Sequence, residues 1–259
     1  MTFVLRSADL GKLNSLTKYP SIQTYHRLDT ANGGLQEEPA IFRGTVLATE
    51  KVDGTNARII LAPDGDYLLG SREELLYARG DLIGNPALGI VEALKPVAER
   101  VRAALPPADE VLVLYGEVFG GKVTAASKQY TAERRVGFRL FDALRLGDYA
   151  GMLARPAAEI AAWRENGGQP FCAEAELLEL AAACELELAP RLLMIDAEDV
   201  PLSVADTAAW LKERLPETLC RLDAAGGGQP EGIVMRTLDR AQIAKLRFED
   251  YERTLRRRK

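Results

Sequence analysis

The strongest constraint on the fold is that strand-like segments occur on both sides of a long helical stretch. Residues 156–225 have the spacing of helices, whereas the sequence on either side is rich in β-branched and aliphatic residues. The predicted strands are a pair within 45–69, then 111–121, 136–144, 231–237 and 241–248. Strands, a helical insertion and returning strands indicate an α+β fold with a sheet that joins distant parts of the chain.

Two turn signals lie among the first strands, and a helix follows them. Asp53-Gly54 and Pro63-Asp64-Gly65 are favoured turns between strands that pair as hairpins. Apolar residues then recur at helical spacing from Ile90 to Val101. We therefore expect a helix over residues 86–105, which the following prolines end.

Composition narrows the chemistry that the chain can perform. Among 259 residues there is one histidine, His26, which excludes H-E-x-x-H zinc sites and any reaction that needs two imidazoles. A Ser-His-Asp or Cys-His triad is possible only through His26, which we interpret as a surface or packing residue. Three cysteines without C-x-x-C spacing favour reduced thiols. If the chain is an enzyme, Lys, Arg, Asp and Glu carry its chemistry.

Charge and hydropathy limit the partners. The sequence contains no signal peptide and no run of about 18 apolar residues, so we expect a cytoplasmic protein without a membrane partner. The net charge of −5 argues against sequence-independent binding of nucleic acid. The charge is uneven, because residues 172–201 hold eight acidic residues and one basic residue, whereas residues 253–259 hold five basic ones. The acidic stretch is either a solvated helical face or a partner interface, and the basic end either a disordered tail or an RNA contact.

The segment Glu50-Lys51-Val52-Asp53-Gly54-Thr55-Asn56 is the clearest candidate for chemistry. Alone it is explained equally well as a β-hairpin, since Asp-Gly is a common turn with Lys and Glu often beside it. As a site, it places Lys51 at a strand end, with a carboxylate and an amide two and five residues further on. Neighbouring cations and burial can lower the pKa of such a lysine until some free amine exists near neutrality, which makes it a nucleophile.

Four further segments favour the functional interpretation. Arg72 supplies a guanidinium for a ribose or phosphate, and Glu117 places a carboxylate at the end of an apolar strand. Residues 138–142, Phe-Arg-Leu-Phe-Asp, supply an aromatic ring for base stacking and an acid. Glu231 adds another carboxylate, and Lys245-Leu246-Arg247 adds two cations. Each segment alone can be explained as a strand cap, core packing or a solvated face. These structural explanations do not account for all five segments occurring in this order.

Together these motifs resemble those of the covalent nucleotidyltransferases, the polynucleotide ligases and mRNA capping enzymes, whose signature is a nucleophilic lysine in K-x-D-G. Over residues 19–251 the chain is most similar to ATP-dependent RNA ligases of the phage type that seals nicks in double-stranded RNA, which usually open with E-K-x-x-G-T-N. DNA ligases and capping enzymes commonly carry Arg at the position of Asn56. The resemblance implies an α+β nucleotidyltransferase (ATP-grasp-like) core of antiparallel sheets flanked by helices, with a helical insertion between residues 136–144 and 231–237.

The resemblance also implies a catalytic set. Lys51 would take the AMP, and Glu117 would hold the ribose or a metal-bound water. Glu231 would support the metal and the chemical steps, so Glu117 and Glu231 are the expected metal residues. Lys245 and Arg247 would bind the phosphates. The family usually has K-x-K at this motif, and Arg247 keeps the charge of the second lysine without its compact ammonium.

Four more residues complete the nucleotide site that the resemblance implies. Arg72 would contact the nucleotide, and Phe141 would stack on adenine. Glu50 and Asn56 match the family's adenine-side and metal-water contacts. The chain ends 12 residues after Arg247, so we expect residues 1–259 to form a single adenylyltransferase domain with no appended oligonucleotide-binding (OB) fold or C-terminal domain.

The activity implied by the resemblance is ATP-dependent joining of RNA 3′-hydroxyl and 5′-phosphate ends through a lysyl-AMP and an adenylylated RNA. ATP would donate the AMP, and Mg²⁺ or Mn²⁺ would bridge phosphate oxygens. The expected partners are RNA with these ends, above all a nicked duplex, and an end-healing or RNA-gripping protein. The alternatives are a DNA ligase or capping-type nucleotidyltransferase, and a non-catalytic module that binds nucleotides or RNA ends.

Overall fold

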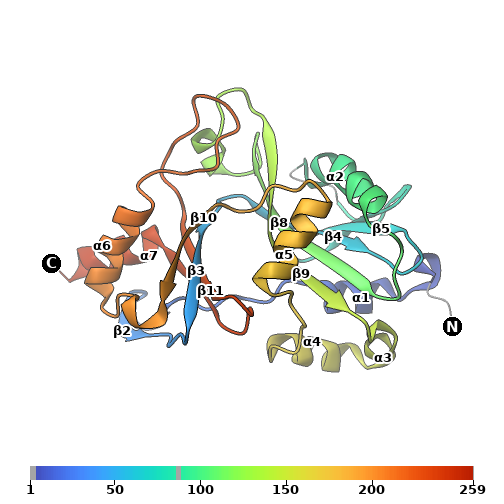
Figure 1. Cartoon of the computed structure of the whole chain (residues 1–259), viewed down its shortest axis with the longest axis horizontal. Helices are drawn as coiled ribbons and strands as arrows, with labels where there is room; N and C mark the ends of the chain where they lie inside the picture. Colours follow the sequence, from blue (N-terminus) through green and yellow to red (C-terminus); the bar gives the residue numbers. More distant parts are fainter. Residues whose placement is uncertain (1–3, 86–88, 259) are drawn as a thin grey trace.

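Two antiparallel sheets form the frame of the molecule (Figure 1). The computed structural model describes residues 4–85 and 89–258. The larger sheet has the order β7-β6-β5-β4-β8-β9, and the smaller has the order β10-β3-β11-β12. The larger contains β4 (Thr55–Leu61), β5 (Tyr67–Ser71), β6 (Leu75–Ala78), β7 (Asp81–Leu82), β8 (Val111–Gly120) and β9 (Val136–Leu146). The smaller contains β3 (Thr45–Lys51), β10 (Arg191–Asp196), β11 (Gly232–Thr237) and β12 (Ile243–Arg247).

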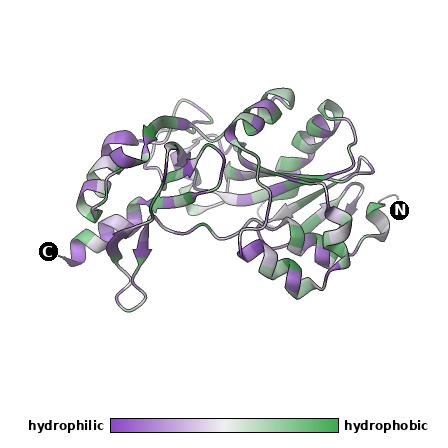
Figure 2. Cartoon of the chain, turned by 60° about the horizontal axis from the view of Figure 1, so that its bottom comes forward, coloured by the Kyte–Doolittle hydropathy of each residue, from purple (hydrophilic) through white to green (hydrophobic). Residues whose placement is uncertain are grey.

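Helices cover both faces of the larger sheet, because successive residues of its strands point to opposite sides. Ile59 packs with α2 (Ile90–Ala104) and α5 (Glu174–Ala183) in one core cluster. Its neighbour Ile60 packs on the other face with α1 (Leu10–Thr17), α3 (Tyr149–Ala154) and α4 (Ala157–Glu165). In Figure 2 the helices carry both hydrophobic and hydrophilic residues, as expected when one side packs and the other meets water.

The smaller sheet has a core of its own with two helices and a hairpin. Residues of α6 (Val204–Arg214) and α7 (Phe248–Arg257) pack against Ala48 and Ile233 of the sheet. The remaining pair, β1 (His26–Leu28) and β2 (Leu35–Pro39), forms a two-stranded sheet beside them. Short 3-10 turns complete the described elements: η1 (Leu5–Ser7), η3 (Ala125–Gln129) and η4 (Ala197–Asp199).

The α+β fold with sequence-distant strand pairing is confirmed. β3 pairs with β11, so that Lys51 lies opposite Gly232, and β11 pairs in turn with β12. The helix predicted over 86–105 is α2, and residues 86–88 lie outside the described residues. Among the described helices none is long and apolar enough to cross a membrane.

The hairpin interpretation of Asp53-Gly54 is wrong, whereas the next turn does join a hairpin. β3 and β4 lie in different sheets, so the chain crosses between the sheets at residues 52–54. Both edges of β3 are occupied by β10 and β11, and both edges of β4 by β5 and β8, which leaves no free edge for a β3–β4 pair. At 63–65 the chain reverses between β4 and β5, with Leu61 opposite Tyr67.

The predicted helical insertion is only partly right. Residues 156–225 contain α4, α5 and α6, but Arg191–Asp196 forms β10 and pairs with β3, and residues 215–225 contain no helix. A short apolar run such as 191–196 fits a strand as well as a helix, and here it pairs with the edge of β3 that faces away from β11. The acidic stretch 172–201 therefore spans a helix and an edge strand rather than one helical face.

Residues 253–257 of the basic stretch lie in α7, which docks on the β1–β2 hairpin instead of extending as a tail. Arg253 Nε donates to the Gly33 carbonyl over 2.8 Å, and the Leu35 N–H donates to Thr254 Oγ1 over 2.9 Å. His26 is fully buried beside this helix, with Nδ1 2.7 Å from the Tyr251 hydroxyl. Of the two roles that the sequence suggested for His26, surface residue or packing residue, the structure shows the packing role.

Candidate active site

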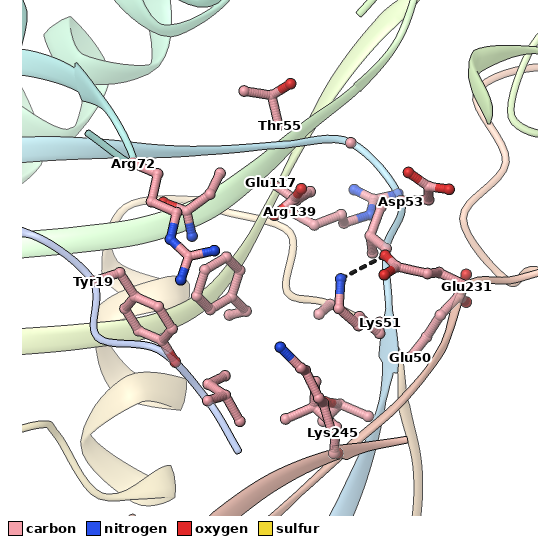
Figure 3. Close-up of a pocket in the computed structure, with 18 of the residues that line it drawn as sticks. Tyr19, Glu50, Lys51, Asp53, Thr55, Arg72, Glu117, Arg139, Glu231 and Lys245 are labelled. Carbon is pink, nitrogen blue, oxygen red and sulfur yellow. Dashed lines mark hydrogen bonds and ion pairs between the residues drawn. The ribbon is translucent and has the colours of Figure 1, made fainter. Parts of the chain in front are cut away.

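A cavity of about 530 Å³ lies where the two sheets meet (Figure 3). Its lining comes from β3, the crossing at 52–54 and neighbouring strands of both sheets. Eight of the nine predicted site residues line it: Glu50, Lys51, Asn56, Arg72, Glu117, Phe141, Glu231 and Lys245. The fold thus gathers residues from most of the chain around one lysine.

Lys51 forms an ion pair with Glu231 at the centre of the cavity (Figure 3). Lys51 Nζ lies 2.5 Å from Glu231 Oε2, and both side chains are about one quarter exposed, at 26% and 23%. The pair follows from strand register, since Lys51 lies opposite Gly232, the residue after Glu231. Gly232 is required there because a Cβ would stand 1.9 Å from the Leu246 carbonyl oxygen. The register therefore holds a carboxylate directly against the candidate nucleophile.

Glu117 and Asn56 add further oxygen atoms to the lining of the cavity. They are opposite each other on β8 and β4. Burial, together with the Glu231 and Asp53 carboxylates, raises the pKa of Glu117 to about 8 against the lowering effect of Lys51. Asn56 Oδ1 is buried without a hydrogen-bond partner among the described residues. An unsatisfied oxygen beside a carboxyl group that favours its neutral form indicates room for a positively charged ligand.

These oxygens suit a divalent cation that keeps most of its own water. Among residues 4–85 and 89–258 no group of three or more His, Cys, Asp or Glu side chains forms a metal cage. Mg²⁺ is bound in this manner by one or two carboxylates together with waters and substrate phosphates. The donor set of Glu117, Glu231 and Asn56 fits such an ion.

Lys245 makes the opposite wall of the cavity positive. In Figure 3 its side chain extends toward Lys51 from β12. Burial lowers the pKa of Lys245, and the nearby cations Arg247, Lys51 and Arg72 lower it further. Three of these cations, Lys51, Arg72 and Lys245, line the same cavity. Such clustered positive charge favours a polyanionic ligand such as a triphosphate.

Arg247 lies outside the cavity lining, unlike the other eight predicted residues. Its Nε and Nη2 donate to the Asp250 carboxylate over 2.7 and 3.1 Å, and Asp250 is buried at the start of α7. The Asp250 carboxylate raises the pKa of the Arg247 guanidinium against the effect of burial. Arg247 therefore joins β12 to α7 in this structure, and its phosphate contact stays a prediction.

Glu50 is buried with its carboxylate bound to the segment that precedes Glu231. It accepts a hydrogen bond from the Leu219 N–H over 2.8 Å and another from the Thr218 hydroxyl. Burial raises the pKa of Glu50, and these hydrogen bonds oppose the shift. The carboxylate thereby ties the strand of Lys51 to residues 218–219, and the predicted adenine-side contact stays a prediction.

Sequence reasoning missed the side chains that join the two sheets beneath Phe141. Asp142 of β9 is fully buried and accepts hydrogen bonds from the Tyr19 hydroxyl over 2.8 Å and from Arg240 Nε over 2.6 Å. Tyr19 lines the cavity and packs edge-on against Phe141, with ring centroids 5.1 Å apart. Asp142 was visible in the sequence only as an acid on a strand, because its partners lie far away in the chain.

The two antiparallel sheets, with the cavity around Lys51 between them, have the fold of solved RNA ligases. The chain belongs to the RNA ligase family, whose family model matches residues 44–248. No curated protein sequence matches the chain. The family predicted from the motifs is thus confirmed.

Solved RNA ligase structures share the fold. A mutant Naegleria gruberi RNA ligase with ATP and Mn superposes with a TM-score of 0.54 at 14% identity, covering 93% of this chain and 62% of that one. An archaeal ATP-dependent RNA ligase superposes with a TM-score of 0.53 at 21% identity, covering 90% of this chain and 49% of that one. The Naegleria gruberi RNA ligase with PPi superposes with a TM-score of 0.53 at 13% identity, covering 92% of this chain and 62% of that one. The chain thus spans about half to three fifths of the length of these proteins.

Proposed function

We propose that this protein is an ATP-dependent RNA ligase that joins a 3′-hydroxyl end to a 5′-phosphate end through covalent lysyl-AMP and adenylylated RNA. The observation that carries the proposal is Lys51, held 2.5 Å from Glu231 in a cavity whose other charged groups are carboxylates and cations suited to a nucleotide. The Naegleria gruberi RNA ligase solved with ATP and Mn supports the same pair of ligands.

In the first step the free amine of Lys51 attacks the α-phosphorus of ATP. A P–N bond forms, the P–O bond to the β-phosphate breaks, and pyrophosphate leaves. The Lys51 ammonium must first lose a proton, and the Glu231 carboxylate 2.5 Å away is the group placed to receive it. Lys245 and Arg72 would stabilise the phosphate charge that develops during the transfer.

The next two steps move the AMP and seal the strand. An oxygen of the RNA 5′-phosphate attacks the phosphorus of lysyl-AMP, which forms a 5′–5′ pyrophosphate bond and breaks the P–N bond, and Lys51 regains a proton. The RNA 3′-hydroxyl then attacks the 5′-phosphate, losing its proton as AMP leaves. Both steps require positioning more than covalent chemistry, which matches a site without histidine.

Glu117 and Glu231 would hold Mg²⁺ or Mn²⁺ with the help of Asn56. When bound, this ion would neutralise phosphate charge and favour the free amine of Lys51. Phe141 and Tyr19 offer aromatic surface for adenine on the side of the cavity that belongs to the larger sheet.

We further propose that residues 1–259 act as one adenylyltransferase domain in the cytoplasm, on nicked duplex RNA. The β3–β11–β12 pairing supports one unit, because it joins early and late parts of the chain at the site. Three buried, free cysteines support a reducing compartment. An end-healing or RNA-gripping protein is the partner class that we propose.

Labelling with α-labelled ATP tests the central proposal. The wild-type protein should acquire covalent label with Mg²⁺, and Lys51→Ala and Lys51→Arg should abolish it, whereas the control Lys212→Ala on the exposed side of α6 should label normally. A labelled Lys51→Ala protein would refute the mechanism. Comparing ATP with GTP, then nicked RNA with nicked DNA and hybrids, separates an RNA ligase from a DNA ligase or capping-type enzyme. A protein that binds ATP without labelling would be the non-catalytic module.

A further inference from the structure

We propose that a groove formed by residues 121–134 binds the sugar-phosphate backbone of the RNA next to the ends being joined. The proposal rests on the proposed RNA ligase function and adds a binding surface outside the nucleotide cavity. The groove has a volume of about 800 Å³ and follows directly after β8, the strand that carries Glu117.

The ionisable side chains that line the groove are all cations, whereas Glu133 and Asp223 lie next to the lining without being part of it. The lining contains the cations Lys122, Lys128 and Arg134 and no carboxylate. All three cations are exposed, and within the described residues none of them forms an ion pair. Two other surface pockets have mixed charge: the pocket around Arg43 includes Asp239, and the pocket around Lys212 includes Glu252. In a chain with a net charge of −5, such a segregated group of free cations suits a polyanion.

The lining also indicates which part of a nucleic acid would bind. The lining also contains Thr124, Ser127 and Thr131, of which the buried Ser127 and Thr131 hydroxyls already donate to Gly120 and Asp223, and it contains no aromatic ring. Phosphate and sugar oxygens are bound by cations, hydroxyls and backbone N–H groups, whereas unstacked bases need aromatic platforms. We infer contacts to the backbone that do not depend on base sequence.

One wall of the groove is held by hydrogen bonds within the protein. Asp223 accepts hydrogen bonds from the Ala132 and Glu133 N–H groups over 2.9 and 3.1 Å and from the Thr131 hydroxyl over 2.5 Å. The Thr131 hydroxyl and these N–H groups lower the pKa of Asp223 to about 2, so the anchor is ionised at neutral pH. The anchored turn holds Arg134 at a φ of 58°, a left-handed conformation that residues other than glycine rarely adopt. A preformed groove lowers the entropy cost of binding.

Hydrogen bonds connect the groove to the segment that follows Lys51. The Asp53 N–H donates to the Tyr130 hydroxyl over 2.7 Å, so the crossing after Lys51 rests on the residue that follows η3. The Leu222 N–H donates to the Tyr130 carbonyl over 2.9 Å, which attaches the segment leading to Glu231. In Figure 1 this segment and η3 lie together at one end of the junction between the sheets. RNA in the groove would therefore lie against the scaffold that holds Lys51 and Glu231.

A triple variant with a charge-matched control tests the groove. Lys122→Ala, Lys128→Ala and Arg134→Asn remove the cations, and Asn tolerates the left-handed backbone at 134. The control, Arg27→Ala/Arg100→Ala/Arg155→Ala, removes three exposed cations from β1, from α2 and from the residue after α3. The probe is a 5′-phosphorylated nicked RNA duplex, whose binding is measured by fluorescence anisotropy from 50 to 300 mM salt. Covalent labelling with ATP and sealing are measured in parallel.

We expect the groove variant to bind the nicked duplex at least tenfold more weakly at 100 mM salt, with the slope of log K against log salt reduced by about 2 to 3. Sealing should fall through a raised KM for RNA, while lysine labelling stays within twofold of wild type. Wild-type affinity and slope in the groove variant, or an equal loss in the control, would overturn the proposal. If the wild-type protein does not label with ATP, the proposed function fails, and the direct RNA-binding comparison still decides the groove.

Discussion

Lys51 and Glu231 are 180 residues apart in the sequence, yet the Lys51 ammonium lies 2.5 Å from the Glu231 carboxylate. The contact exists because β11 pairs with β3 in a register that puts Gly232 opposite Lys51. Glu50 ties the same strand to the segment before Glu231 through Thr218 and Leu219. The lysine and its acceptor are thus held by backbone pairing on one side and by a buried carboxylate on the other.

Neutralising the acceptor should remove most lysine adenylation. In Glu231→Gln the ammonium keeps a hydrogen-bond partner but loses the group that receives its proton, so we expect the labelling rate to fall about 100-fold, or about 3 kcal/mol in activation free energy. The measurement is single-turnover labelling with α-labelled ATP. Glu217→Gln, an exposed acid in the same segment paired with Arg221, is the control and should label normally. Normal labelling of Glu231→Gln would exclude Glu231 as the acceptor.

Stability should depend on pH through Glu117. Its folded pKa of about 8 lies above the ordinary value of 4.5, so the folded state binds more protons between these values. Its contribution to stability is therefore fully present below pH 4.5 and is lost as the pH rises through about 8. In EDTA, the free energy of unfolding of the wild type should fall over this window more steeply than that of Glu117→Gln. Urea unfolding at pH 5, 7 and 9 measures both slopes, and equal slopes would contradict the assignment.

Added Mg²⁺ should reverse this effect if Glu117 helps to hold the ion. Binding requires the carboxylate, so Mg²⁺ should stabilise the wild type more at pH 8 than at pH 6. Mg²⁺ should stabilise the Glu117→Gln variant less than the wild type at both pH values. The midpoint of urea unfolding, with and without Mg²⁺, is the readout. A gain in Glu117→Gln as large as in the wild type would remove Glu117 from the metal site.

Breaking the buried Asp142 cluster should destabilise the protein strongly. Asp142→Asn leaves Arg240 without its buried counter-charge and should cost about 3–5 kcal/mol, measured by urea unfolding. Asp66→Asn, which breaks the exposed 3.3 Å pair with Arg79, should cost less than about 1 kcal/mol. In a cycle with Arg240→Met, the double variant should lose less than the sum of the single variants. Additive losses would show that the two residues are not coupled.

The chain crossing at Gly54 should tolerate no side chain. A Cβ there would stand 2.3 Å from the Val118 carbonyl oxygen and 2.9 Å from Glu117 Cγ. Gly54→Ala should therefore displace the segment after Lys51 and reduce lysine labelling at least tenfold, while circular dichroism shows a folded protein. Gly147→Ala, where a Cβ meets nothing within 4 Å, should match the wild type. Full labelling by Gly54→Ala would show that the close approach is unimportant.

Sequence and structure agree best where a motif is local. The strands 111–121 and 136–144 and the helix within 86–105 follow from periodicity, and they appear as β8, β9 and α2. The same reasoning failed at Asp53-Gly54, where a favoured hairpin turn instead carries the chain from one sheet to the other. Turn propensity describes four residues, whereas the choice of partner strand depends on which edges the rest of the fold leaves open.

The sequence by itself determined the order of the motifs, the α+β class and the family, because these depend on residue type and spacing along the chain. Only the tertiary structure decided which carboxylate meets Lys51, that Arg247 turns to Asp250, and that Asp142 is bound by Tyr19 and Arg240. The physical reason is that backbone hydrogen-bonding groups are the same in every strand. Strand partners, and with them all contacts between charges far apart in the sequence, are therefore selected by the packing of the whole chain.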